Sequence, residues 1–215
     1  MQPFTSLTGI AAPLPLDDVN TDQIAPSGLR PGSEPDYKEM LFWRWRLAAD
    51  GQGKSDFVLN QPQFREAKIL VAGRNFGCGS SRESAVWALT ANGIRCVIAG
   101  SFGPFFRDNC LQNGVLPVAL PADELTSITE VAIAANGAAP FTVDLEATTV
   151  RPPQGPAVPF QIGDSERLCL LQGLDSIGLT MKHAALIRAW EERTRANYPW
   201  LQAAYDRRIP RIPRS

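Results

Sequence analysis

The sequence has little of what a protein needs to build its own metal site. His183 is the only histidine, and the four cysteines, Cys78, Cys96, Cys110 and Cys169, are scattered without a CxxC pair. None of the cysteines has a histidine at the spacing of a metal ligand. We therefore expect no zinc or iron–sulfur site made by this chain alone. In a reducing compartment the cysteines should be free thiols.

Charge of one sign and long apolar runs are also missing. The 215 residues carry a net charge of −1, so their bulk charge attracts neither nucleic acid nor an anionic membrane. No run is long and apolar enough to cross a bilayer. The N-terminal sequence MQPFTSLTGIAAPLPLDD has no basic start, no uninterrupted apolar core and no cleavage signal. These absences predict a cytoplasmic protein that contacts neither nucleic acid nor membrane.

The middle of the sequence alternates between strand and helix patterns. β-prone runs at 68–72, 94–100 and 115–120 are separated by helical segments at 82–92 and 102–113. Strands that alternate with helices in this way are typical of an α/β layer. The rhythm therefore predicts that the three strands pair in parallel.

The flanking segments have less regular patterns. Before the middle, we expect loops around a short strand to residue 35, a helix at 37–48 and a loop at 51–62. After it, we expect a helix from Pro121 to about 135, a half-exposed strand at 141–150 paired with 157–162, a helix at 164–172 and a long helix from about 179 to 197. The prediction is one domain, 1–215, with a core at about 10–192, a helical C-terminal end and a loose tail at 199–215.

The densest chemical signal is the turn GRNFGCGSSRE, residues 73–83, between a predicted strand and a predicted helix. Its glycines, including Gly79, let the backbone approach a ligand closely, and we expect Ser80 and Ser81 at the N-cap of the helix. Outward N–H groups, the helix dipole and the planar charge of Arg82 suit a carboxylate or phosphate. The residues alone leave two interpretations open: an anion-binding turn with a positioned hydroxyl, or simply a capped strand-to-helix turn. The spacing fits neither a Walker loop nor the GxGxxG dinucleotide motif.

The same turn resembles the signature of the small subunits of 3-isopropylmalate dehydratase (isopropylmalate isomerase), a family similar to the mobile fourth domain of aconitases. Three further stretches resemble this family: Asn20–Pro26 (NTDQIAP), Asn109–Pro117 with the strand before it, and Gly173–Thr180 (GLDSIGLT). His183 follows the last stretch, where the family also tends to have a histidine. The resemblance runs from about residue 10 to residue 192. It implies a swivelling β/β/α domain, an α/β layer beside a curled set of strands.

The resemblance also implies a mechanism. In this family a separate large subunit uses three cysteines to hold a 4Fe–4S cluster, which acts as the Lewis acid for the departing water. A 2-hydroxy dicarboxylate is enclosed when the small subunit moves over it. Ser80 would then be the base, and Ser81 and Arg82 would hold the substrate carboxylate beside Gly79. Arg30, the nearest arginine after NTDQIAP, is a further candidate for carboxylate binding, with an exposed surface arginine as the alternative.

The implied reaction is the interconversion of 2-isopropylmalate and 3-isopropylmalate in leucine biosynthesis. The sequence departs from the family at Ser84 and Val86, where His and Pro are usual. Residues 27–40 lack the usual residues near "TGFG", a region that contributes to the choice of substrate. Two alternatives therefore stay open: a paralogue for another 2-hydroxy dicarboxylate, and a non-catalytic anion-binding regulatory module.

A few residues near these motifs have simpler expected roles. Asp22 is expected to order its loop through backbone hydrogen bonds, with a place in the site as the alternative. Asn109 and Asn113 are expected at turns or helix ends. Cys78 lies next to the predicted helix start, but a nucleophilic thiol needs a base. His183, in the predicted C-terminal helix, is expected to be a surface or interface residue.

Overall fold

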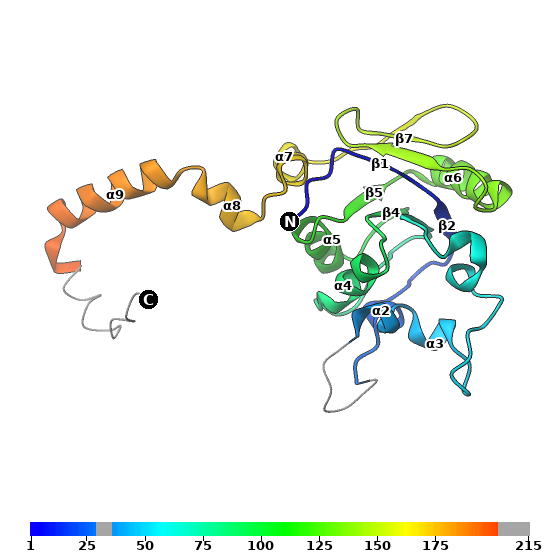
Figure 1. Ribbon diagram of the computed structural model, residues 1–215. Helices are drawn as coiled ribbons and strands as arrows, with labels where there is room; N and C mark the ends of the chain where they lie inside the picture. Colours follow the sequence, from blue (N-terminus) through cyan, green and yellow to red (C-terminus); the bar gives the residue numbers. More distant parts are fainter. Residues whose placement is uncertain (29–35, 202–215) are drawn as a thin grey trace. The chain divides into compact units, whose positions relative to one another are not determined.

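The computed structural model describes residues 1–28 and 36–201 (Figure 1). The chain divides into two compact units, Met1–Asp175 and Ser176–Ser215. Of the loose tail predicted at 199–215, only 199–201 are described, and they are helical. The prediction of one domain over 1–215 stays a prediction.

Two four-stranded sheets form the first unit. The parallel sheet has the order β2 (Ala11–Leu14), β3 (Ile69–Ala72), β4 (Cys96–Ala99), β5 (Leu116–Ala119). The antiparallel sheet has the order β1 (Ser6–Gly9), β6 (Phe141–Asp144), β7 (Thr149–Arg151), β8 (Val158–Pro159). The parallel pairing predicted for the middle of the chain is confirmed. So is the pairing of the AVPFQI segment with the strand before it.

The helices of the first unit are α1 (Thr21–Ile24), α2 (Tyr37–Met40), α3 (Trp43–Arg46), α4 (Ser84–Ala91), α5 (Pro104–Gln112), α6 (Ala122–Ala135) and α7 (Asp164–Gln172). Two short 3₁₀ helices, η1 (Val58–Asn60) and η2 (Pro62–Phe64), precede β3. The second unit contains α8 (Ser176–Met181) and α9 (Ala184–Asn197). No helix in the described ranges is long and apolar enough to cross a membrane.

Three predicted elements differ from the structure. The helix predicted at 37–48 is two helices, because Phe42 between them is left-handed (φ 50°) and its N–H donates to the Ile24 carbonyl at 2.7 Å. The strand predicted at 141–150 is the hairpin of β6 and β7, whose turn is fixed by the Ala147 N–H donating to the Asp144 carboxylate at 2.8 Å. The long C-terminal helix starts earlier, at 176, and is interrupted before His183, the N-cap of α9.

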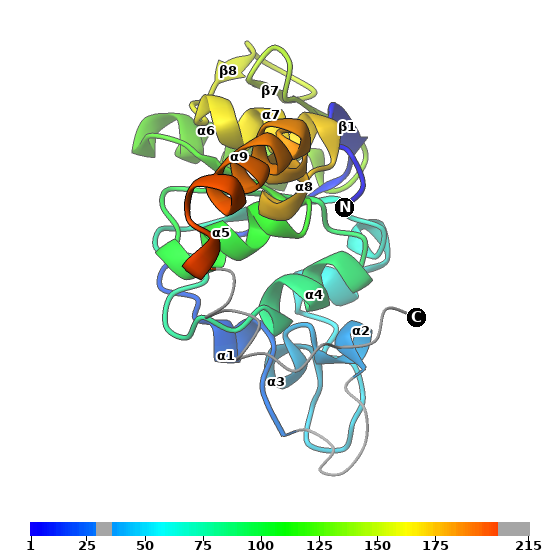
Figure 2. The ribbon, with the colours of Figure 1, turned by 90° about the vertical axis from the view of Figure 1, so that its left-hand side faces the viewer.

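The parallel sheet is buried on both faces. Along β3, Leu70 and Ala72 pack in the cluster that includes the apolar face of α4. Ile69 and Val71 point to the other face, in the cluster formed with the antiparallel sheet and α6. A parallel sheet covered on both faces needs continuous apolar strands, which explains the ILVA sequence of β3. The resulting layers are visible in Figures 1 and 2, and they confirm the α/β swivel-type fold.

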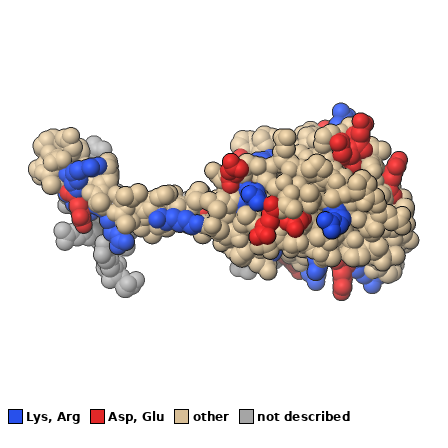
Figure 3. Space-filling model, turned by 90° about the horizontal axis from the view of Figure 1, so that it is seen from above, with Lys and Arg blue, Asp and Glu red and all other residues tan. Residues whose placement is uncertain are grey.

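Charges on the first unit are mixed. Seen from above, Figure 3 shows Lys and Arg side chains interspersed with Asp and Glu on the face nearest the viewer. The ion pairs of this unit include Arg107 on α5 with Glu166 on α7, at 2.6 and 2.7 Å in a two-pronged contact. Because α5 carries side chains that hold the glycine-rich turn, this pair connects the turn's support to α7.

Candidate functional site

The glycine-rich turn lies at the carboxyl end of β3, between the segments that follow β2 and β4. It bonds to the first segment through Thr21 N–H to Cys78 O (3.0 Å) and Gly77 N–H to Val19 O (2.7 Å). It bonds to the second through Phe76 N–H to Ser101 O (3.0 Å). Ligands of open α/β sheets bind outside the carboxyl ends of the strands. The turn therefore lies where such a fold places its site.

Two positions of the turn require glycine, each for a different structural reason. A Cβ on Gly77 (φ 73°) would lie 2.1 Å from Cγ of Phe106, so only glycine allows the turn to pack on α5. Gly79 has φ 96°, but nothing lies closer than 3.8 Å to a Cβ there. Gly79 is therefore required for backbone conformation rather than for space. Its predicted role in substrate binding stays a prediction.

The two serines precede the helix and do not cap it. The N-cap of α4 is Glu83, and the helix begins at Ser84, so the predicted N-cap role of Ser80 and Ser81 is wrong. The reason is that other segments hold the backbone of the serines. Ser80 N–H donates to the Thr21 hydroxyl at 3.3 Å, and the Asn109 side chain donates to the Ser81 carbonyl at 3.0 Å. Both serines are exposed at the surface of this chain.

Arg82 connects the two halves of the site. Its Nε donates to Ser80 Oγ at 3.0 Å, and its Nη2 donates to the carboxylate of Asp22. The Arg82 side chain is 33% exposed and that of Asp22 is 62% exposed. A guanidinium that donates to a hydroxyl oxygen stabilises the deprotonated form of that hydroxyl. The arrangement therefore supports a serine alkoxide, with Asp22 fixing the orientation of Arg82.

Sequence reasoning placed some of these residues in the wrong role. The loop before the site is ordered by Asn20, which forms a reciprocal capping box with Gln23 at α1 (2.9 and 2.7 Å). The Asp22 carboxylate accepts from Arg82 instead, and its alternative place in a substrate site stays a prediction. Thr21, whose hydroxyl accepts from Ser80 N–H, was not singled out from the sequence. The N-x-x-Q spacing of Asn20 and Gln23 was a readable sign of a capping box, and hence of a helix that begins at Thr21. Asn109 lies inside α5, where it supports the turn.

The rim of the site carries a second, tight ion pair. Asp17 accepts from the backbone N–H of Arg74 at 2.6 Å and from its side chain at 2.9 and 3.1 Å. The backbone hydrogen bond, followed by the side-chain one, lowers the pKa of the Asp17 carboxyl. Beside this pair, Asn75 donates to Asp18 at 2.8 Å, and both have positive φ, 55° and 56°. Asn and Asp tolerate this conformation better than most residues. The rim therefore consists of two loops, each with one residue in a left-handed conformation, joined by this hydrogen bond.

The other candidates take no part in the contacts of Arg82 with Ser80 and Asp22, or lie outside the described residues. Arg30 lies outside the described residues. His183 is exposed in the second unit. The Cys78 thiol donates to the Asp18 carbonyl at 3.4 Å. Cys96 and Cys110 are fully buried, and burial raises the pKa of both thiols well above the usual range. These two act as small apolar side chains.

No group of three or more His, Cys, Asp or Glu side chains that could hold a metal occurs in the described ranges. At the site, the Asp22 carboxylate is paired with Arg82 and the Asp17 carboxylate with Arg74. The donors gathered at the turn are serine hydroxyls, backbone N–H groups, a guanidinium and one thiol, that of Cys78, which donates to the Asp18 carbonyl. This donor set fits an anionic substrate and does not fit a cluster of iron.

Comparison with known proteins gives a consistent result. The model of the aconitase C-terminal domain matches residues 1–123, and that of the C-terminal domain of the 3-isopropylmalate dehydratase small subunit matches 176–204. A 3-isopropylmalate dehydratase small subunit from Dinoroseobacter shibae is 48% identical over 94% of this chain and all of that protein. One from Rhodospirillum centenum is 48% identical over 93% of this chain and 98% of that protein.

A solved structure agrees. The crystal structure of a 3-isopropylmalate dehydratase from Methanocaldococcus jannaschii is 25% identical and matches with a TM-score of 0.59. The match covers 86% of this chain and 99% of the other. Fold, turn and near full-length similarity agree, and the chain belongs to the family of 3-isopropylmalate dehydratase small subunits, which carry the aconitase C-terminal domain.

Proposed function

We propose that this chain is the small subunit of a heteromeric hydro-lyase that interconverts 2-isopropylmalate and 3-isopropylmalate in leucine biosynthesis. The observation that carries the proposal is the contact of Arg82 with both Ser80 and Asp22 on the glycine-rich turn. The names of the relatives support the same activity. A cytoplasmic location is part of the proposal.

Ser80 serves as the base in this proposal. A serine hydroxyl is a weak base in water, so its alkoxide needs nearby donors and positive charge. Arg82 supplies both, since its guanidinium is a cation whose Nε already donates to Ser80 Oγ. The alkoxide takes the proton from the carbon next to a substrate carboxylate, and the hydroxyl group leaves from the neighbouring carbon. The proton taken by Ser80 and the departing hydroxide together make one water, and adding them back with the two carbons exchanged moves the hydroxyl between those carbons.

Substrate binding falls to the same turn. A carboxylate of the diacid is held by Arg82, Ser81 and the backbone near Gly79, where a planar guanidinium can form two parallel hydrogen bonds. Arg30 is a proposed second contact to a carboxylate. The 4Fe–4S cluster belongs to the large subunit in this proposal and supplies Lewis-acid chemistry at the departing hydroxyl. The residues of this chain position the diacid and move its proton.

The exposure of the site supports the need for a partner chain. Ser80 and Ser81 are open to solvent, where an alkoxide would be quenched by water. A second surface must therefore cover the turn during catalysis. The second unit also exposes large apolar side chains that a partner could bury: Ile177, Met181, Leu186, Trp190, Trp200 and Leu201. Exposed apolar side chains mark an interaction surface where they form a contiguous patch.

The two departures from the family do not disrupt the fold. Ser84 is the first residue of α4 and is partly exposed. Val86 is fully buried in the core, and its N–H donates to the Glu83 carbonyl at 2.9 Å. Proline, usual in the family at this position, has no N–H for that bond. The start of α4, shortly after Ser80, is therefore held by a hydrogen bond that a proline at this position would not make.

A reconstitution assay tests the proposal. The purified chain is mixed without oxygen with the cluster-loaded large subunit from the same genome. Dehydration of 2- and 3-isopropylmalate is followed beside citrate, citramalate and other malates. Turnover that requires both proteins supports the hydro-lyase, and the preferred diacid identifies the substrate. Complex formation without turnover on any diacid would reject it in favour of a regulatory module.

A further inference from the structure

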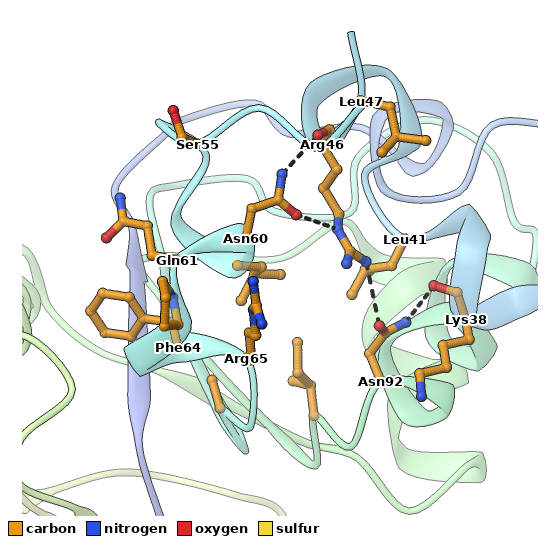
Figure 4. Close-up of a pocket in the computed structure, with 15 residues that line it drawn as sticks. Lys38, Leu41, Arg46, Leu47, Ser55, Asn60, Gln61, Phe64, Arg65 and Asn92 are labelled. Atoms are coloured by element: carbon orange, nitrogen blue, oxygen red, sulfur yellow. Dashed lines mark hydrogen bonds between the residues drawn. The ribbon is translucent and has the colours of Figure 1, made fainter. Parts of the chain in front are cut away.

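A cavity lies at the C-terminal end of α4, whereas the glycine-rich turn precedes the N-terminal end of this helix. Figure 4 shows the residues that line the cavity. It has a volume of about 720 Å³ and is bordered by α2, α3, the η1–η2 segment and the end of α4. α4 has eight residues, so about 12 Å of helix separates its two ends. A cavity of this size accommodates a small organic molecule. Because the length of α4 separates the two, the cavity is distinct from the site that contains Ser80.

The charged lining of this cavity has one sign. Among the described residues that line it, the charged ones are Lys38, Arg46 and Arg65, and none is an aspartate or glutamate. Asp36 and Glu39 line a neighbouring hollow, which Lys38 and Arg46 also border. Asp36 is engaged at the start of α2, where it accepts from the backbone N–H groups of Lys38 and Glu39 at 2.9 and 3.1 Å. Three cations around one cavity favour an anionic occupant.

Arg46 is held in a fixed position by two amides. Its Nε donates to Asn60 Oδ1 at 3.1 Å, and its Nη1 donates to Asn92 Oδ1 at 3.4 Å (Figure 4). Each amide is itself anchored. Asn60 Nδ2 donates to the carbonyls of Arg46 and Lys54 at 2.7 and 2.8 Å. Asn92 Nδ2 donates to those of Lys38 and Ala88 at 3.0 and 2.8 Å.

The charge of Arg46 is only partly compensated. Burial lowers the pKa of its guanidinium, because a cation withdrawn from water loses hydration. Its described partners are neutral amide oxygens, and no carboxylate within the described part of the chain forms an ion pair with it. A desolvated cation is stabilised by an anion that enters its cavity.

A purely structural role accounts for Arg46 but not for its neighbours. Arg46 braces α3 against the C-terminal end of α4, where the helix dipole favours a cation. Lys38 and Arg65, however, have no side-chain hydrogen bond or ion pair in the part of the chain that the structure describes, and both border the cavity. Figure 4 shows Arg65 and Arg46 reaching toward the same space from different elements. Cations that converge without an acidic partner point to a ligand.

We propose that this cavity binds a small organic anion with two or more carboxylate or phosphate groups, held by Arg46 and Arg65 with Lys38 at the rim. Arg46 is pre-oriented by its amides and contacts one anionic group through its remaining N–H donors. Arg65 contacts a second group as a planar fork. The site is independent of the turn that contains Arg82, and the ligand need not be the substrate of the enzyme.

The test is a titration of the full chain, monitored by NMR at the side-chain amides of Asn60 and Asn92. The protein carries Arg82→Ala, so that anions bound at the turn do not contribute. Malate is the carboxylate probe, inorganic phosphate is the phosphate probe, and chloride at equal ionic strength is the control. We expect saturable shifts with one probe or both below about 10 mM. The preferred probe tells a carboxylate ligand from a phosphorylated one.

Variants decide between a ligand site and a structural brace. Arg65→Ala should weaken binding about tenfold or more, because it removes a charge-assisted contact. Arg44→Ala is the matched control: Arg44 lies on the same helix as Arg46 but does not line the cavity, so affinity should not change. Affinity unchanged in Arg65→Ala overturns the proposal, as does the absence of saturable shifts at Asn60 and Asn92. Arg65 is exposed, so its variant should fold as the parent does.

Discussion

Replacing Ser80 with alanine tests the proposed role of Ser80 as the base. The structure predicts that Ser80→Ala leaves the fold intact, because Ser80 is exposed and its hydroxyl contacts Arg82 Nε at the surface. Loss of one exposed hydrogen bond should cost less than about 1 kcal/mol of unfolding free energy. For a chain of this size, that is a change in Tm of less than about 4 °C. Any larger loss of activity must then come from the chemistry.

The expected effect on the reaction is much larger. A positioned acid–base group contributes about 10²- to 10⁴-fold to the rate. At 1.36 kcal/mol for each factor of ten, this is about 2.7–5.4 kcal/mol of transition-state stabilisation. Ser80→Ala should therefore reduce kcat by at least about 100-fold. KM should change little, because Ser81 and Arg82, the proposed contacts to the substrate carboxylate, are still present.

The assay follows the unsaturated diacid by ultraviolet absorbance in the reconstituted two-subunit enzyme. Association is measured in parallel by size-exclusion chromatography. Ser84→Ala is the matched control, since Ser84 begins α4 next to the turn and should keep kcat near the parent value. A kcat for Ser80→Ala within about threefold of the parent would remove Ser80 from the base role. Loss of association in the variant would refute the claim that Ser80 acts in chemistry alone.

Two further predictions concern the support of the site. Gly77→Ala should destabilise the chain by about 2–5 kcal/mol, because its Cβ would lie 2.1 Å from Phe106 at a positive φ; thermal unfolding checks this, with Gly79→Ala, which has open space, expected to cost less. The hydrogen bonds from Arg107 lower the pKa of the Glu166 carboxyl below its ordinary value of 4.5. The pair therefore stabilises the folded chain at pH values above 4.5, where Glu166 is ionised in the folded and the unfolded chain. This stabilisation should fade as the pH falls through the lowered value. Urea unfolding should show a shallower acid-side decline in Glu166→Gln, and an unchanged decline would contradict the assignment.

Much of the fold could be predicted because its middle is locally encoded. The strand ILVA, the helix that ends before Gly93 and the helix that ends before Gly114 carry their own start and stop signals. Gly93 and Gly114 have φ values of 81° and 74°, as helix-ending glycines should. The helix predicted at 37–48 fails for a different reason. Its break at Phe42 depends on a hydrogen bond to Ile24, and such a long-range contact leaves no local pattern.

Some features of the candidate site could likewise be predicted from local sequence, and others depend on contacts between distant segments. The turn could be found from its glycines, serines and arginine, and the family resemblance gave Ser80 and Arg82 their expected roles. The contact between Arg82 and Asp22 spans 60 residues of sequence, so neither residue type nor spacing could reveal it. The N-cap prediction for the serines failed because Thr21 and Asn109, from other elements, hold their backbone. Tertiary contacts thus decided the details that local signals could not.

The order of the strands explains why distant motifs meet in one place. β2, β3 and β4 are adjacent and parallel, so the segments after them emerge at the same edge of the sheet. The NTDQ segment follows β2, the glycine-rich turn follows β3, and the segment leading to Asn109 follows β4. Each therefore reaches the site directly from a buried strand, which gives rigid support to side chains that are themselves exposed. That combination suits a half-site, because a rigid open turn loses little entropy when it is covered by a partner chain that excludes water.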